Sequence, residues 1–150
     1  YLVMDALGTK VLLDWIALGS TATVLNGAPA VYPTLADGVT ATSHATAWSV
    51  AGAIAEIFAD TVFATDDFLI TDVVLDTISA DDDYQLILYT GASGSEVVCA
   101  NLKFSDASDK KLQLGLRFPK ATRLSARLVS KSSSSRTANV SINYRNWRAA

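Results

Sequence analysis

The sequence predicts an all-β protein, an antiparallel β-sandwich or jelly roll with an extended, loop-rich N-terminal segment. Hydrophobic residues recur at every second position through most of residues 66–150, which is the period of a half-buried strand. Turn-forming segments separate these runs at intervals of roughly 10–15 residues, as they do in sandwiches and jelly rolls. Half of the residues are hydrophobic and 18% are charged, a composition that suits a packed core and excludes a disordered chain.

The first 65 residues are the least regular part of the chain. The runs "KVLLDWIAL" and "STATVL" could each form a strand, whereas "GAPAVYPTLADGVTATSHATAW" is rich in Ala, Thr, Gly and Pro and has no strong period. We interpret this segment as an extended arm that packs on the sandwich or on a neighbour. The run "WSVAGAIAEIFADT" fits helical and strand spacing alike, and the Thr, Val and Phe that follow it favour a strand.

Five later runs alternate with a period of two, and no helical period fits them. The faces that this alternation predicts are Leu69, Thr71, Val73, Leu75 and Thr77 against Phe68, Ile70, Asp72, Val74 and Asp76; Tyr84, Leu86 and Leu88 against Gln85, Ile87 and Tyr89; Leu112, Leu114, Leu116 and Phe118 against Gln113, Gly115 and Arg117; Leu124, Ala126 and Leu128 against Arg123, Ser125 and Arg127; and Ala138, Val140, Ile142 and Tyr144 against Asn139, Ser141, Asn143 and Arg145. Residues 97–104 are a less regular strand.

Turn chemistry separates the runs, in "SADDD", "TGASGS", "SDASDKK", "FPKA" and "SKSSSSR". A length of 150 residues is enough for one domain with a real core and too short for two comfortable ones. We therefore predict a single β-sandwich domain over residues 1–150. Residues 1–50 would be partly an extended arm or loops, and residues 51–150 would hold the main strands.

No apolar run approaches the ~20 residues that a bilayer-spanning helix needs. The longest candidates, "KVLLDWIALG" and "SVAGAIAEIFA", contain Asp14 and Glu56, and no leader with a charged start and an apolar centre is visible. We expect neither a targeting signal nor a membrane partner. Cys99 is the only cysteine, so a disulfide or a cysteine metal cluster within one chain is excluded, and its apolar setting predicts a small buried hydrophobe.

The net charge of −3 conceals a strong segregation along the chain. Residues 1–100 hold one lysine against thirteen Asp and Glu, whereas residues 101–150 hold eleven Lys and Arg against two Asp. Such asymmetry can mark a basic tail for nucleic acid. It can equally mean that acidic and basic strands are neighbours within one fold or across subunits, where complementary charge adds specificity.

The stretch "TRLSARLV" tests the nucleic-acid interpretation. Arg123 and Arg127 share a face with Ser125, and the opposite face is wholly apolar, as the solvated side of an antiparallel sheet would require. Aromatic residues for base stacking do not interleave with the arginines, and the chain is acidic overall, so its far field repels phosphate. We predict a solvated face, with contacts to a protein partner as the next alternative and no nucleic-acid partner.

No local motif predicts catalysis, a cofactor or a metal. His44 is the only histidine and stands in a polar segment, with nothing local to complete a Ser-His-Asp site. The segment "TGASGSEV" lacks both the Gly-x-Ser-x-Gly elbow and a phosphate loop, which leaves a hairpin loop. Asp81, Asp82 and Asp83 lack calcium-loop spacing, so we expect a solvated acidic turn, with Ca²⁺ the first choice if a metal were bound.

The runs "DDDYQLILYTGASGSEVVCANLKF" and "LRFPKATRLSARLVSKSSSSRTANVSINYRNW" resemble a segment of small structural proteins of tailed bacteriophages. In that family a Gly-x-x-Gly-Ser-Glu turn follows a Tyr-bearing strand, and a Pro-x-x-Thr-Arg-Leu/Ile-x-x-Arg segment, a Ser-rich loop and a strand ending in aromatics come later. The matching residues here are Gly91, Gly94, Ser95, Glu96, Pro119, Thr122, Arg123, Leu124 and Arg127. The family usually has Gly or Asn where this chain has Ala121, so this chain differs from the family at the turn residue but has a loop of the same length.

The resemblance implies a virion component, and several phage decoration, or cement, proteins are β-sandwich or jelly-roll domains that trimerise on the capsid surface. We therefore expect a non-enzymatic virion structural protein, a capsid decoration protein that stabilises the phage head through surface contacts. Its partners would be the major capsid protein or another virion protein, and a further copy of itself, with a homotrimer favoured. The alternatives are a tail, baseplate or fibre component, or a carbohydrate-binding β-sandwich, for which Trp15, Trp48 and Trp147 are too dispersed to form a visible platform. A hydrolase would rest on His44 alone.

Overall fold

A computed structural model describes residues 24–25, 28–34 and 38–148 of the chain. The candidate strand at residues 10–18 and Trp15 lie outside this part, and of "STATVL" only Val24 and Leu25 are described. The regular structure of the described residues is strand throughout, and no described helix is long and apolar enough to cross a membrane. The strands are β1 (Val24–Leu25), β2 (Ala30–Tyr32), β3 (Val39–Thr42), β4 (Ala55–Phe58), β5 (Asp67–Asp76), β6 (Asp83–Thr90), β7 (Val97–Ser105), β8 (Lys110–Phe118), β9 (Leu124–Ser130) and β10 (Thr137–Arg148).

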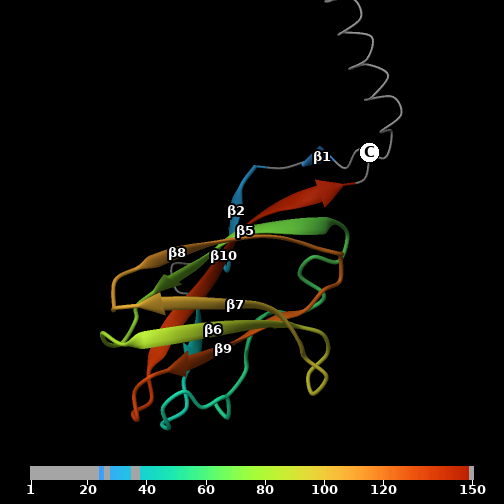
Figure 1. Ribbon diagram of the computed structural model, residues 1–150. Helices are drawn as coiled ribbons and strands as arrows, with labels where there is room; N and C mark the ends of the chain where they lie inside the picture. The colour runs from blue at the N-terminus through green and yellow to red at the C-terminus, as the bar shows by residue number, and fades with distance from the viewer. Residues whose placement is uncertain (1–23, 26–27, 35–37, 149–150) are drawn as a thin grey trace, which may run out of the picture.

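The strands form two antiparallel sheets, as Figure 1 shows. One sheet has the order β1-β10-β5-β8, with β2 and β3 also pairing with β10, and the other has the order β4-β9-β6-β7. From β3 onward the chain passes repeatedly between the sheets: β3, β5, β8 and β10 lie in the first, and β4, β6, β7 and β9 lie in the second. The eight strands β3 to β10, four in each sheet and linked by these crossings, form a jelly roll, to whose first sheet β1 and β2 are added. The predicted fold class is confirmed.

The core lies between the sheets, where their inward faces meet. Leu124, Ala126 and Leu128 of β9 have no exposed surface, and the predicted inward face of β6 is equally buried. From the first sheet the core receives Val73, Leu75, Ala138, Val140 and Ile142. Burial of each large side chain contributes about 1.5–3 kcal/mol, so this layer is the main source of stability.

Aromatic rings fill one part of the core. Phe63, from the turn after β4, stacks on Phe68 with ring centres 4.3 Å apart, and it meets Phe58 and Tyr144 edge to face at 4.9 and 4.7 Å. Offset stacks and edge-to-face pairs are the geometries that aromatic quadrupoles favour. The turn that carries Phe63 is thereby fixed to both sheets.

The prediction of one unbroken alternation along β5 is wrong, although the alternation holds on each side of a bulge near Thr71. Phe68 and Ile70 are buried on the core side together with Val73 and Leu75, because β5 has an extra residue opposite β10, where Ile70 pairs with Tyr144 and Asp72 with Asn143. The extra residue of a β-bulge moves every later side chain to the other face. In the ambiguous run at residues 48–61, only Ala55–Phe58 forms a strand, and the residues before it are turns and bends.

Candidate interaction surfaces

The fold brings together, as ion pairs, the opposite charges that the sequence separates into two halves. Six of the seven ion pairs of the described residues join a cation of residues 101–150 to a carboxylate of residues 1–100. They are Lys111–Asp72, Arg117–Asp67, Arg123–Glu56, Arg123–Glu96, Lys131–Asp83 and Arg136–Asp82. Acidic and basic strands are therefore neighbours in the sandwich, which was one of the two arrangements that the sequence left open.

Arg123 is anchored rather than free in solvent. Its Nε pairs with Glu56 of β4, and one terminal nitrogen donates to the Gly91 carbonyl at 3.1 Å and to Glu96 at 3.3 Å. The hydrogen bond to Glu56 raises the pKa of Arg123 above its ordinary value. One guanidinium thus fixes the edge strand β4 and the β6–β7 loop to β9.

Arg127 lies four residues further along the chain, on the same outward face. Its guanidinium carbon is 5.5 Å from the centre of the Tyr89 ring, and a terminal nitrogen donates to the Tyr89 hydroxyl at 3.2 Å. The Nε of Arg127 and the Oγ of Ser125 are buried without a hydrogen-bond partner in the described part of the chain. The prediction that the leucine face of β9 is buried and the arginine face is outward is confirmed, but this outer face is more covered than a solvated one.

The β6–β7 connection is the predicted hairpin loop. Gly91 and Gly94 adopt positive φ angles of 106° and 85°, and a side chain at Gly91 would come within 2.9 Å of the Ser95 carbonyl. Glu96 accepts the Gly94 N–H at 2.9 Å. Backbone N–H groups, first that of Glu96 and then that of Gly94, lower the pKa of Glu96.

The acidic turn consists of carboxylates that diverge to separate donors. Asp81 accepts the backbone N–H of Ala107 at 2.8 Å, and Asp83 pairs with Lys131 at 3.1 Å. Asp82 accepts two backbone N–H groups, from Asp83 at 2.8 Å and from Ser132 at 3.0 Å. No group of three or more His, Cys, Asp or Glu in the described residues could hold a metal ion. Asp81 and Asp83 are exposed, as a solvated acidic turn requires, and the three carboxylates also link this turn to the β7–β8 and β9–β10 loops.

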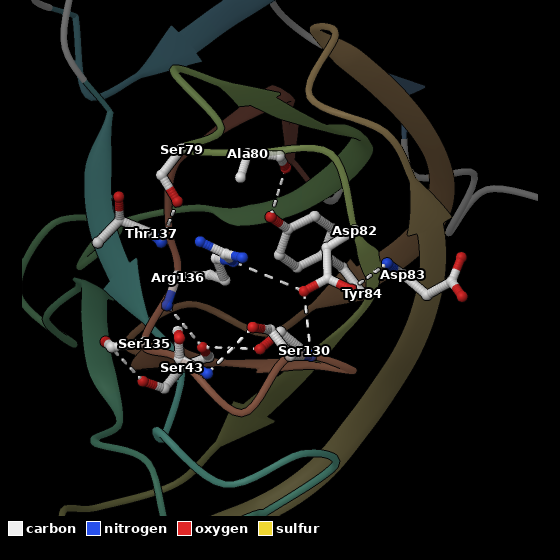
Figure 2. Close-up of polar contacts among 12 residues, drawn as sticks. Ser43, Ser79, Ala80, Asp82, Asp83, Tyr84, Ser130, Ser135, Arg136 and Thr137 are labelled. Atoms are coloured by element: carbon white, nitrogen blue, oxygen red, sulfur yellow. Dashed lines mark hydrogen bonds and ion pairs between the residues drawn. The ribbon is translucent and has the colours of Figure 1, made fainter.

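A polar network next to this turn joins four segments of the chain (Figure 2). The Nε of Arg136 lies 3.6 Å from Asp82, and its backbone N–H donates to Ser43 Oγ at 2.9 Å. Ser43 Oγ is in turn 3.0 Å from Ser130 Oγ, and the Tyr84 hydroxyl donates to the Ala80 carbonyl at 2.6 Å. Desolvation, with a smaller contribution from Asp82, raises the pKa of Tyr84. We call this network the clasp, because it holds the four segments together at this end of the sandwich.

His44 and Cys99 have simple surroundings. His44 is exposed between β3 and β4, where its Nδ1 accepts the backbone N–H of Thr46 at 3.1 Å. Cys99 is partly buried and packs against the main core, and this burial raises the pKa of its thiol, so the prediction of a small apolar residue fits its place. Neither residue is brought beside a second group with which it could form a catalytic pair among the described contacts.

Two surface features remain after these contacts are assigned. Val97 and Val98 of β7 are 66% and 54% exposed on a strand that pairs only with β6 among the described strands. Trp48 is 47% exposed, in the connection from β3 to β4, and borders a cavity of about 360 Å³. The side chain of Trp147 lies outside the described part, so the sequence's third tryptophan is not placed.

Comparison with protein families and with curated proteins found no match. Among solved structures, chains from the structures of infectious bursal disease virus strains Gx and Gt are similar, with 16% and 18% identity and a TM-score of 0.40 each. The matches cover 79% and 78% of this chain, which spans about a third (33%) of the length of those chains. A TM-score of this size assigns no function, and the jelly roll rests on the strand order itself.

Sequence reasoning missed a second apolar cluster on the outer face of the β4-β9-β6-β7 sheet. Ile87, Tyr89 and Val129 are buried there, on the side that the alternation assigned to solvent. A signal was present: Leu86, Ile87, Leu88 and Tyr89 are apolar on both phases, as are Leu128 and Val129. Apolar side chains on both phases indicate a strand that is covered on both faces.

Proposed function

We propose that this chain is a non-enzymatic virion structural protein, specifically a capsid decoration protein that stabilises a phage head. The observation that carries the proposal is the jelly-roll strand order, because viral capsid domains are one of the main uses of this architecture. The resemblance of the second half of the chain to phage structural proteins supports the same role. His44, Asp81 and Asp82 accept backbone N–H groups within and between loops, and Cys99 packs against the core, which also suits a protein that acts through its surface.

Decoration would stabilise the head by mass action. A protein that binds the assembled shell and not the separated subunits adds RT ln(1 + [L]/Kd), about 2.7 kcal/mol per site at a hundredfold excess over Kd. The partner is the major capsid protein, and a homotrimer would place three copies of each contact on one capsomer. Symmetric repetition of this kind multiplies a weak contact without new chemistry.

The exposed edge of β7 is our choice for the shell contact. Its outward backbone groups have no strand partner among the described residues, and Val97 and Val98 extend the apolar surface beside them. An exposed strand edge is a ready template for another chain, and exposed valines increase the buried apolar area on binding. The partner segment would be an extended strand of the capsid protein.

Cryo-electron microscopy of the particle tests the location directly. We expect density for the protein on the head, at threefold positions. Density on the tail alone would overturn the decoration role and leave a virion role standing, and absence from the particle would overturn both.

Binding to purified expanded heads tests the surface. We expect the Val97→Asp/Val98→Asp variant to lose at least tenfold in affinity, because an edge carrying charge no longer accepts an apolar strand. Val62→Asp is the matched control, since Val62 is also an exposed valine but lies in the turn after β4. Equal loss in both variants would contradict the choice of β7, and light scattering of the free protein would report whether it is a trimer.

A further inference from the structure

Trp48 occupies a backbone conformation that disfavours its side chain. Its φ angle is 54°, in the left-handed region that bulky residues rarely adopt. Its own N–H donates to the Ser130 carbonyl at 2.7 Å, which ties this position to the end of β9. Strain of this kind persists where the surroundings impose it, and it often marks a functional position.

The loop that carries Trp48 is ordered by its own hydrogen bonds. Thr46 donates its N–H to His44 Nδ1, Ser49 donates to the Thr46 carbonyl at 3.2 Å, and Ala51 donates to Ser49 Oγ at 3.2 Å. The strained position is therefore held from both sides. A side chain presented on such a loop is placed before any ligand arrives, which lowers the entropic cost of binding.

The cavity beside Trp48 combines an aromatic surface with polar groups of both kinds. Its lining residues are Trp48, Asp83, Tyr84, Lys103, Phe104 and Ser105. Tyr84 and Phe104 are stacked with ring centres 5.0 Å apart, but both rings belong to the main core, so Trp48 is the aromatic side chain that this cavity offers to a ligand. Asp83 can accept hydrogen bonds, Lys103 can donate them and Ser105 can do both. Figure 2 shows the Asp83 side chain pointing away from the Arg136 network, and the contact of its carboxylate is the ion pair between Oδ2 and Lys131 at 3.1 Å, at the exposed surface.

A second cavity of about 630 Å³ continues from the first, because both are lined by Asp83 and Ser105. It adds Asp81, Asp82 and Asp106 against Lys131 and Arg136, so carboxylates outnumber cations along this surface. Asp82, Asp83 and Asp106 are paired with Arg136, Lys131 and Lys110, so this surface has no cluster of unpaired cations among its described residues to hold a phosphate, sulfate or carboxylate ligand, and the chain as a whole has a net charge of −3. The preferred ligand is therefore uncharged or carries no net negative charge.

We propose that Trp48, Asp83, Lys103 and Ser105 form a binding site for an uncharged glycan. Sugar rings present C–H faces that pack on an aromatic ring, and hydroxyl groups that both donate and accept at the rim. A half-exposed, preorganised tryptophan next to a carboxylate, an ammonium and a hydroxyl offers each of these contacts. The second cavity gives room for further sugar units along the same surface. The site stands apart from the proposed virion role, because glycan binding and shell binding are measured separately.

The test is binding of the full chain to an array of neutral oligosaccharides and their sialylated and sulfated counterparts. We expect binding to at least one neutral series and none to the anionic forms. Trp48→Ala should weaken this binding at least tenfold, and Trp48→Phe should weaken it less because an aromatic face remains. Lys103→Met keeps the aliphatic stem and removes the donor, so a loss of about fivefold is expected, about 1 kcal/mol by the logarithmic relation.

Val50→Ala is the control, since Val50 is 57% exposed in the same loop but does not line either cavity. It should leave glycan affinity within twofold of the wild type. The bond from the Trp48 backbone to Ser130 survives substitution of the side chain, and thermal unfolding of each variant would establish that the fold is intact. If Trp48→Ala fails to fold, Lys103→Met is sufficient to test the proposal, because Lys103 is exposed on β7 and its substitution should leave the fold intact.

Three results of the array alone would overturn the proposal. These are an array without neutral binding, neutral binding that Trp48→Ala and Lys103→Met leave unchanged, and binding confined to anionic glycans. If Trp48→Ala leaves the array unchanged and instead abolishes binding to phage heads, the tryptophan is a protein contact and the glycan site is refuted.

Discussion

Asp82 accepts the backbone N–H of Ser132 at 3.0 Å, although the two residues are 50 positions apart in the sequence. The same carboxylate accepts the N–H of Asp83 and lies 3.6 Å from Arg136. One side chain thus joins the β5–β6 turn to the β9–β10 loop. Its exposed fraction is only 10%, so these contacts are made largely out of water.

Asp82→Ala is expected to lower the free energy of unfolding by about 2–3 kcal/mol. Removal of the carboxylate leaves the Ser132 N–H and the Arg136 guanidinium partly buried without their acceptor, and such losses cost about 1–3 kcal/mol. Asp82→Asn retains one acceptor oxygen and should cost less. Urea denaturation measures both, and an alanine variant within about 0.5 kcal/mol of the wild type would show that the clasp is dispensable.

Ala121→Gly is expected to stabilise the protein by about 1 kcal/mol. Ala121 has a φ angle of 56° and is exposed, and the left-handed conformation costs a non-glycine residue about 1–2 kcal/mol, part of which glycine's greater unfolded-state entropy offsets. Thermal unfolding should show a rise of several degrees.

Gly115→Ala is the reverse experiment. Gly115 has a φ angle of 65°, and an added Cβ would meet no atom within 4 Å, so conformational strain is the whole effect. We expect a loss of about 1 kcal/mol. If Ala121→Gly and Gly115→Ala changed stability in the same direction, left-handed strain would not be the cause.

The fold was more accessible to sequence reasoning than the surface was. Alternation placed the inward faces of β6 and β9 correctly, because these two strands pair in one register throughout. It also placed the leucine face of β8 correctly, although the register of β8 against β5 shifts between Leu116 and Gln113. It failed on β5, where the bulge after Ile70 leaves no mark in composition. The ion pairs between the two halves depend on strand order, and strand order is set by packing of the complete sandwich rather than by local sequence. Trp48 is an example at the candidate site: its strain and its cavity neighbours come from β6, β7 and β9.

Acid should destabilise the protein as the pH falls from about 4 to about 2. The Ser108 hydroxyl, the Lys110 ammonium and the Ser108 N–H lower the pKa of Asp106 from 3.8 to about 2. The pKa values of Asp67, which accepts the Lys120 N–H and binds Arg117, and of Glu96 are lowered as well. Since these groups bind protons more weakly in the folded state, the unfolded chain takes up protons first. Their stabilisation is complete above about pH 5 and is lost as the pH falls through the folded pKa.

Ser108→Ala removes the largest cause of the Asp106 shift and should raise that pKa, as carboxyl carbon titration by NMR would report. The loss of urea stability between pH 4 and pH 2 should become shallower in Ser108→Ala and shallower still in Asp106→Asn. An unchanged pH profile in Asp106→Asn would show that this carboxylate is not linked to folding.

Val129→Ala is expected to cost about 2 kcal/mol, although its side chain lies on the face that alternation assigned to solvent. Val129 is 1% exposed and packs with Ile87 and Tyr89 in the outer cluster. The substitution removes two buried methyl groups, each worth about 0.8 kcal/mol, and leaves a small cavity. Val98→Ala removes the same atoms from a side chain that is 54% exposed, so it should stay within about 0.5 kcal/mol of the wild type. Urea denaturation of the two variants, with equal m values, separates the cases. If both variants changed the free energy of unfolding equally and by little, the outer cluster would cover the sheet without stabilising the fold. Only the inner face of the sheet would then contribute to stability.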